Sequence, residues 1–197
     1  MIEIYHSEAS FRENDFEYVW SGQNERCWRV RFNHQVEQRT REAMEEGGEP
    51  TTETVYTCDY MDYYAPFSYV PSSALELIKD IVTANIHEYD NSDNVNGFML
   101  NGNNVWLDKD TRVGLMNSTT IQKAAGAIKA DLWFGNMSLS IECDTIIALL
   151  SQLELYALEC YNKTAEHLKN VSLLTSVDEV AAYDFTAGYP SKLEVAV

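Results

Sequence analysis

The longest periodic segment of the chain runs from Asp144 to about Ser172 and predicts a helix of roughly 43 Å at 1.5 Å per residue. Apolar residues follow one another at alternating helical spacings in this segment, as in Ile146, Leu150, Leu153, Ala157 and Cys160. Further apolar residues widen the stripe, so that it can bury against a sheet on one side and a second helix or subunit on the other. We therefore expect this helix to be the spine of its domain and the chain to form a homo-oligomer.

Two tight-turn signals predict β-hairpins before this helix. Asn101-Gly102, the strongest short hairpin signal, separates the apolar residues of 98–107 into two arms. Gly135-Asn136 divides 128–141 in the same way, and alternating apolar residues predict that both arms bury the same face. The sequence therefore predicts two hairpins that share a domain with the long helix.

Capping signals mark the remaining helices. The capping box 73–76 opens a helix that ends before Asp90, and the box 176–179 opens a short helix to about Tyr183. Residues 193–197 can then add a terminal strand. These signals place helices on either side of the two hairpins.

The segment between the hairpins predicts two further helices. Asp108 or Asp110 can cap the first, and Thr119-Thr120 restarts a second that Gly126 closes. The polar cluster 90–94 resembles half of a calcium loop, but it lacks the glycine and glutamate that such a loop needs. We therefore predict a turn at this cluster and assign no calcium.

The N-terminal part of the chain differs from the rest in its residue pattern, which predicts a β-rich region. Strands are expected at residues 2–6, 16–20, 26–32 and 51–60. Residues 35–46 are almost wholly polar, so we expect them to loop out into solvent. Arg29 and Arg31 alternate with apolar residues, which is typical of a sheet with one wet side. A boundary near Pro71 gives a β-rich region of residues 1–70 and an α+β domain of residues 71–197.

A tyrosine-dense run ends the N-terminal region. Its candidate interface residues are Tyr60, Tyr63, Tyr64, Phe67 and Tyr69. Tyrosine offers a large contact area at low entropic cost, which suits an interface with a protein or a sugar. The alternative is that the run packs on its own domain, where each hydroxyl needs a partner.

The charge of the chain restricts its partners. It carries 31 acidic and 14 basic residues, a formal net charge of −17. Nucleic-acid binding depends on a basic surface that releases counterions, so we expect no direct contact with nucleic acid or with an anionic membrane. Such a charge keeps an abundant or densely assembled protein in solution. The alternative is an acidic DNA mimic that occupies a host nucleic-acid-binding protein.

The cysteines and histidines give no metal signature. Because no C-x-x-C pair is present, we expect four free, mostly buried thiols. A Cys27–Cys58 bridge between two strands is conceivable, but cytoplasmic redox conditions argue against it. The four histidines stand apart in the sequence, so we assign no metal ligand and no cofactor.

Catalytic motifs are also missing from the sequence. It contains no P-loop, nucleophile elbow, dinucleotide-binding fingerprint or zinc-protease motif. Asp144 and Glu154 could form a carboxylate pair, but a helix cap explains Asp144 better and a polar helix face explains Glu154 better. We assign no catalytic residue and expect a protein that is not an enzyme. No membrane span is expected, since no run of about twenty apolar residues occurs, and no secretory leader is expected, since the N-terminus lacks a basic segment followed by an apolar stretch.

Four strings in the second half of the chain carry a resemblance to a known family. They are residues 105–118 (VWLDKDTRVGLMNS), 132–134 (LWF), 153–162 (LELYALECYN) and 182–190 (AYDFTAGYP). Over roughly residues 85–194 the chain resembles an uncharacterised domain of tailed phages and prophages of gut Bacteroidales. The resemblance implies a protein of the virion or of tail-fibre assembly, with a structural or chaperone role. It supplies no active-site residues.

These expectations combine into one functional hypothesis. The chain is expected to contact other phage structural proteins through a variable N-terminal region, in the virion or in the cytoplasm of the infected host. Arg112, within the first string, is expected to pair with Asp108 or Glu142. The alternatives are the DNA mimic, a cryptic enzyme and a glycan-binding module that uses the tyrosine-dense run.

Overall fold

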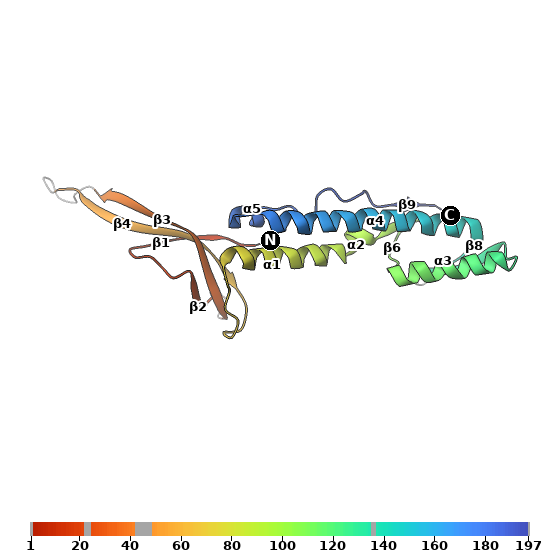
Figure 1. Cartoon of the computed structure of the whole chain (residues 1–197), viewed down its shortest axis with the longest axis horizontal. Helices are drawn as coiled ribbons and strands as arrows, with labels where there is room; N and C mark the ends of the chain where they lie inside the picture. Colours follow the sequence, from red (N-terminus) through yellow and green to blue (C-terminus); the bar gives the residue numbers. More distant parts are fainter. Residues whose placement is uncertain (1, 22–24, 42–48, 135–136, 197) are drawn as a thin grey trace. The chain divides into compact units, whose positions relative to one another are not determined.

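The protein has an α+β fold, as its sequence predicts. Nine strands and five helices occur among the residues that the structure, a computed structural model, describes (Figure 1). The described residues are 2–21, 25–41, 49–134 and 137–196 of the 197-residue chain.

The chain forms two compact units, each built from two separate segments. The first unit comprises residues 1–81 and 174–183, and the second comprises residues 82–173 and 184–197. This division differs from the predicted boundary near residue 70. The difference arises because a helix crosses from one unit into the other and a short helix near the C-terminus belongs to the first unit.

The first unit contains a four-stranded antiparallel sheet in the order β1-β4-β3-β2 (Figure 1). Its strands are β1 (Tyr5–Ala9), β2 (Phe16–Trp20), β3 (Arg26–Arg41) and β4 (Thr51–Tyr63). The predicted hairpin of β2 and β3 is confirmed, with Phe16 opposite Val30. Residues 22–24, in its predicted turn, lie outside the described residues. β1 lies later than the predicted strand 2–6, because its pairing with β4 places Tyr5 opposite Tyr60.

The prediction that residues 35–46 loop out is wrong for their first half. β3 continues to Arg41 and pairs with β4 up to Arg41 opposite Thr51, so the two strands form one long ribbon. A bulge after Phe32 interrupts the register, and Asn33 takes a left-handed φ of 54° there. Beyond the bulge, exposed polar pairs such as Gln38 and Thr54 face each other across the ribbon. Residues 42–46 lie outside the described residues.

The expectation of one wet side to this sheet fails at Arg31. Only 5% of this residue is exposed, because the segment before β2 covers it. Its guanidinium donates to Glu13 Oε1 at 2.9 Å, to Glu17 Oε2 at 3.0 Å and to the carbonyl oxygen of Asn14 at 3.0 Å. Arg29 is partly exposed and forms a bidentate pair with Asp62 at 2.9 Å. The charged face of the sheet is therefore neutralised by pairing.

Both capping boxes predicted from the sequence open helices. α1 (Ala74–Asp90) follows Ser73, whose Oγ accepts a hydrogen bond from the Glu76 amide at 3.1 Å. α5 (Val177–Ala181) begins after Ser176, where both hydrogen bonds of a capping box are present. In both cases the serine hydroxyl satisfies an amide that the first turn of a helix leaves without a partner.

Two short sheets in the second unit confirm the predicted hairpins. β5 (Phe98–Leu100) and β6 (Asn103–Val105) meet across Asn101 and Gly102, whose φ values of 48° and 79° are those of a tight hairpin turn. The arms are shorter than expected and end before residue 107. The predicted C-terminal strand forms β9 (Glu194–Val195), which adds to β5 in parallel. β7 (Lys129–Phe134) and β8 (Met137–Glu142) form the second hairpin, and its turn residues 135–136 lie outside the described residues.

The segment between the hairpins forms one helix, not the two that we predicted. α3 (Lys109–Ala124) begins after the cap Asp108, whose carboxylate accepts from the Thr111 amide. It continues through Thr119, which is buried, and Gly126 follows its end with a φ of 94°. The polar cluster at 90–94 forms the predicted turn, in which Ser92 caps the short helix α2 (Asp93–Asn96).

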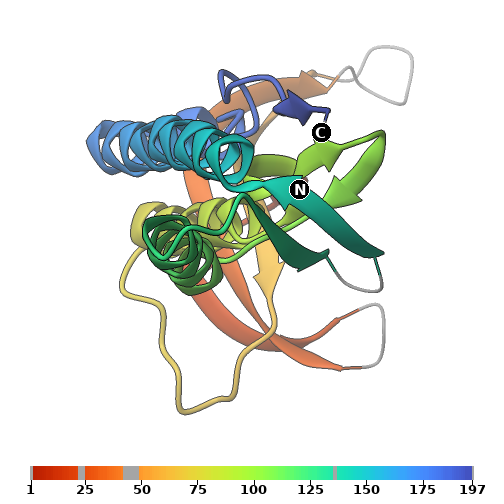
Figure 2. The same ribbon diagram turned by 90° about the vertical axis from the view of Figure 1, so that its right-hand side faces the viewer.

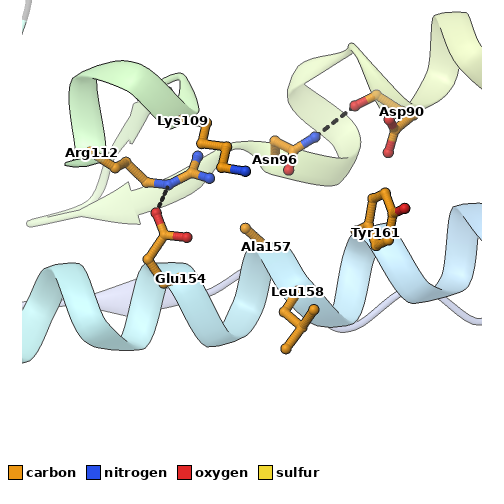
Figure 3. Close-up of a pocket in the computed structure, with 8 residues that line it drawn as sticks. All are labelled: Asp90, Asn96, Lys109, Arg112, Glu154, Ala157, Leu158 and Tyr161. Carbon is orange, nitrogen blue, oxygen red and sulfur yellow. Dashed lines mark hydrogen bonds and ion pairs between the residues drawn. The ribbon is translucent and has the colours of Figure 1, made fainter. Parts of the chain in front are cut away.

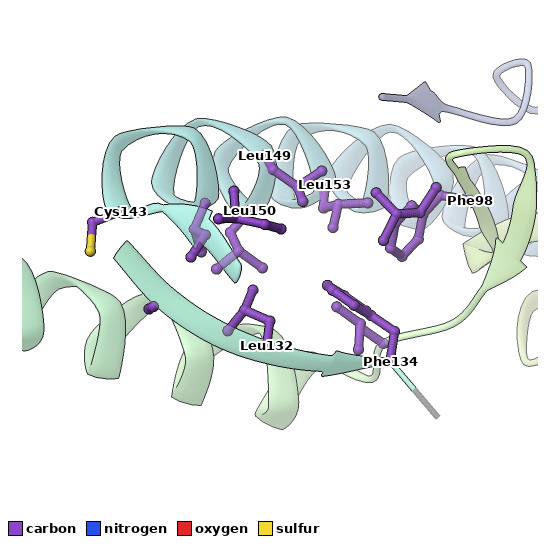
Figure 4. Close-up of a cluster of buried hydrophobic side chains, with 12 residues drawn as sticks. Phe98, Leu132, Phe134, Cys143, Leu149, Leu150 and Leu153 are labelled. Carbon is purple, nitrogen blue, oxygen red and sulfur yellow. The ribbon is translucent and has the colours of Figure 1, made fainter. Parts of the chain in front are cut away.

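The spine of the second unit is α4 (Cys143–Leu173), close to its predicted bounds. It packs against α3 and the β7-β8 hairpin (Figure 2). Figure 4 shows Leu149, Leu150 and Leu153 of α4 facing Leu132 and Phe134 of β7 across the core. Because α4 starts at Cys143, Asp144 lies in its first turn and pairs with Lys123 of α3 instead of capping the helix.

All four cysteines are buried and form no disulfide. Burial raises the pKa of the Cys27, Cys58 and Cys160 thiols, which disfavours the reactive thiolate. We expect 5,5′-dithiobis(2-nitrobenzoate) to label the native protein slowly and all four thiols to react at once in 6 M guanidinium. A stoichiometric fast reaction in native buffer would contradict this burial.

No helix in the described part of the chain is long and apolar enough to cross a bilayer. Among the same residues, no group of three or more histidine, cysteine, aspartate or glutamate side chains is arranged to hold a metal ion.

Candidate interaction surfaces

An aromatic surface covers one face of the sheet in the first unit. It comprises six side chains from β2, β3, β4 and the segment that follows β4: Tyr18, Trp20, Trp28, Tyr63, Phe67 and Tyr69. Side chains two positions apart on a strand share a face, and Tyr18 and Tyr63 both lie opposite Trp28 in the register. The strand pairing therefore gathers these rings from distant parts of the sequence.

Phe67 is the exposed centre of the aromatic surface. Its ring stacks on Trp28 at 5.9 Å with an interplanar angle of 9°, and its edge meets Tyr18 at 5.2 Å. The Trp28 indole donates to the carbonyl oxygen of Pro66 at 3.3 Å, which fixes the chain just before Phe67. Phe67 nevertheless remains 68% exposed. A large apolar ring is thus held rigidly and presented outward.

Two further contacts extend the aromatic surface along the sheet. The guanidinium of Arg26 lies 4.9 Å from the centroid of the exposed Trp20 ring, within the range of a cation–π interaction. At the other side, Tyr63 and Tyr69 contact each other with ring centroids 5.6 Å apart. The aromatic surface therefore consists of aromatic rings with one cation, Arg26, at its edge.

The structure divides the predicted interface residues between two faces. Tyr63, Phe67 and Tyr69 belong to the aromatic surface, and Tyr64 is exposed beside them in the chain. Tyr60 lies on the opposite face, where it stacks on Tyr5 at 5.4 Å and lies 4.3 Å from the Arg29 guanidinium. The sequence reasoning missed Tyr18, Trp20 and Trp28, although their alternation within the predicted hairpin could have placed them on one face.

A pocket of about 370 Å³ with both charged and apolar lining residues lies in the second unit (Figure 3). It is lined by the end of α1, α2, the start of α3 and the middle of α4. The lining residues are Asp90, Asn96, Lys109, Arg112, Glu154, Ala157, Leu158 and Tyr161.

Arg112 forms one wall of the pocket and is only 8% exposed. Its Nε donates to Glu154 Oε1 at 2.8 Å, and its Nη1 donates to the carbonyl oxygen of Leu107 at 2.6 Å. The predicted pairing with Asp108 or Glu142 is thus replaced by an ion pair across α3 and α4. Sequence reasoning had no signal for it, because the two residues are far apart in the chain.

The opposite wall of the pocket is also fixed by hydrogen bonds. Asp90 Oδ1 accepts from Thr164 Oγ1 at 2.7 Å, and the Asp90 carbonyl oxygen accepts from Asn96 Nδ2 at 2.7 Å. Thr164 is buried and also shares a hydrogen bond of 2.9 Å with the Tyr189 hydroxyl. Burial raises the pKa of Tyr189, so its hydroxyl stays protonated and can continue this network.

The suggested carboxylate pair of Asp144 and Glu154 is not assembled. Asp144 pairs with Lys123 and Glu154 pairs with Arg112, so a different cation of α3 holds each carboxylate. Acid–base catalysis by such a pair needs both groups at one reacting bond. Comparison of the chain with protein-family models, with curated proteins and with solved structures gave no match.

Proposed function

We propose that the protein is a non-enzymatic component of a tailed phage particle, or of its tail or fibre assembly, and that it acts through protein–protein contacts. The aromatic surface of the first unit is the attachment site in this proposal. The single observation that carries the binding role is the exposure of Phe67 on top of a fixed Trp28 ring.

Aromatic side chains of this kind favour protein contacts for energetic reasons. Tyr, Trp and Phe are enriched at interfaces, and a few well-packed anchors carry most of the binding free energy. Because Phe67 is already stacked, little side-chain entropy is lost when a partner covers it. The net charge of −17 supports a densely assembled protein that stays apart from nucleic acid. The phage context rests on the sequence resemblance.

The proposal is tested by quantitative mass spectrometry of gradient-purified particles against the lysate of infected cells. A virion component should be recovered at a fixed ratio to the capsid protein. Abundance in the lysate with absence from particles would remove the virion role. The partner captured from that lysate would then decide between an assembly factor and an acidic inhibitor of a host nucleic-acid-binding protein.

Phe67→Ala should lower the recovery of the protein with its particle or assembly partner by at least about tenfold, the loss typical of an interface anchor. Phe11→Ala is the matched control, because Phe11 is equally exposed in the first unit and makes no ring contact with the described residues. Thermal unfolding midpoints of both variants show that the fold is retained. Equal recovery of the two variants would exclude the aromatic surface as the attachment site.

A further inference from the structure

The pocket of the second unit presents two cations in a strongly acidic chain. Figure 3 shows the Lys109 amino group and the Arg112 guanidinium on the same side of the pocket, above Glu154. Glu154 accepts from Arg112 Nε, and the Leu107 carbonyl accepts from Nη1. Within the described part of the chain, no group accepts from Nη2 and none forms an ion pair with Lys109. Asp90 and Glu154 also line the pocket, but Glu154 already accepts from Arg112 Nε and Asp90 from Thr164, so Arg112 Nη2 and the Lys109 amino group are left as donors toward the pocket.

The N-terminus of α3 lies at this pocket, but its cap Asp108 does not pair with the free donors of Lys109 and Arg112. Asp108 caps α3 and accepts hydrogen bonds from the amide and hydroxyl of Thr111 at 2.8 and 2.9 Å. These bonds lower the pKa of the Asp108 carboxyl, so the cap keeps its negative charge. An anion in the pocket would thus meet the side chains of Lys109 and Arg112, while the amide of Thr111 in the first turn already has a partner.

After Glu154, the side chains that α4 contributes to the pocket are largely apolar, and further apolar side chains of α4 lie outside the pocket. Leu158 and Tyr161 line the pocket, yet both side chains are more than half exposed. Leu155 lies one turn earlier on the same helix and is also exposed. An occupant that covered these side chains would extend along α4, beyond the volume that a single small molecule fills.

We propose that this pocket binds an acidic peptide segment of a partner protein. The peptide carboxylate would lie between Lys109 and Arg112, and a neighbouring apolar side chain would contact Leu158 and Tyr161. The formal charges of the lining residues Asp90, Glu154, Lys109 and Arg112 cancel, so hydrogen-bond complementarity supports this occupant: a carboxylate supplies the acceptors that Arg112 Nη2 and Lys109 lack. This binding site is separate from the aromatic surface and does not depend on the phage role.

The test uses the full ¹⁵N-labelled chain and two synthetic peptides, acetyl-Gly-Phe-Glu-Leu-Gly-amide and its counterpart with Gln in place of Glu. We expect saturable amide shifts at Lys109, Arg112 and Tyr161 with the Glu peptide, and about tenfold weaker binding of the Gln peptide. Lys109→Gln should weaken the Glu peptide by about threefold to fivefold. Lys169→Gln, on an exposed part of α4, makes the same charge change away from the pocket and should leave binding unaltered.

Three outcomes would overturn the proposal. Equal affinities for the Glu and Gln peptides would show that the two cations do not recognise a carboxylate. Equal losses of affinity for the Glu peptide in Lys109→Gln and Lys169→Gln would show that binding depends only on the net charge of the chain. If 4-phenylbutyrate bound as tightly as the peptide, the pocket would be a site for free carboxylates instead. None of these results depends on recovery of the protein in phage particles, so the two proposals can fail separately.

Discussion

Leu150→Ala should lower the free energy of unfolding of the second unit by about 3 kcal/mol. Leu150 is 0% exposed on the buried face of α4, within the cluster that joins α4 to the β7-β8 hairpin (Figure 4). Removal of its side chain loses apolar burial and leaves a cavity that rigid neighbours on both sides cannot fill. Urea unfolding followed by circular dichroism at 222 nm measures the loss, because α3 and α4 supply much of the helical signal.

The matched control for this substitution is Leu155→Ala on the same helix. Leu155 is 63% exposed, so its truncation should change the free energy of unfolding by less than about 0.5 kcal/mol. Both substitutions remove the same atoms and change helix propensity equally. Equal losses for the two variants would mean that the buried face of α4 is assigned incorrectly.

Arg31→Ala should destabilise the first unit by about 2 kcal/mol. The substitution removes three hydrogen bonds and leaves Glu13 and the Asn14 carbonyl without their cation. The loss stays below that of a fully buried pair, because Glu17 is half exposed and can be hydrated again. Trp28 is buried whereas Trp20, Trp106 and Trp133 are exposed, so the shift of the tryptophan emission to longer wavelength should report exposure of Trp28 and should occur at lower urea concentration than in the parent protein.

Arg12→Ala is the control for the Arg31 experiment. Arg12 pairs with Asp15 in the same covering segment at 2.9 Å, but both partners are about half exposed. Its loss should cost less than about 1 kcal/mol. Addition of Glu13→Gln to Arg31→Ala should recover part of the lost stability, since an uncompensated carboxylate is then removed. An unchanged double variant would assign the loss to packing alone.

Local signals in the sequence were sufficient for much of the fold. Asn101-Gly102 forms its hairpin because both residues adopt positive φ, and the cap at Ser176 forms because its partner Glu179 lies within one turn. The long helix follows from an apolar stripe that needs only helical periodicity. Each of these elements is specified by residues that are close together in the chain.

Elements that depend on distant partners were not predictable in the same way. The ribbon beyond Phe32 has two polar faces, so no apolar alternation identifies it, and cross-strand pairs such as Arg41 with Glu53 stabilise it instead. α3 remains continuous at Thr119 because tertiary packing buries this residue. This packing overrides the weak local signal by which Thr119-Thr120 was predicted to begin a second helix. Arg31 is buried by a loop whose position no pattern in β3 reveals.

The candidate surfaces show the same limit. The tyrosine-dense run was visible in the sequence, but its division between two faces depends on the register of β3 and β4. A shift by one residue would have exchanged Tyr60 and Tyr63. The pocket was not predicted at all, because Arg112 and Glu154 meet only when α3 packs against α4.

The division of each unit into two segments has a consequence for the order of folding during synthesis. Because α5 belongs to the first unit and β9 to a sheet of the second unit, neither unit has all its parts until a ribosome has added residues 174–183 and 184–197. Domains of one continuous segment can fold as they emerge, one after the other. Both units of this chain are instead completed only after residue 173 has been made, and its many acidic residues supply repulsion between nascent copies until then.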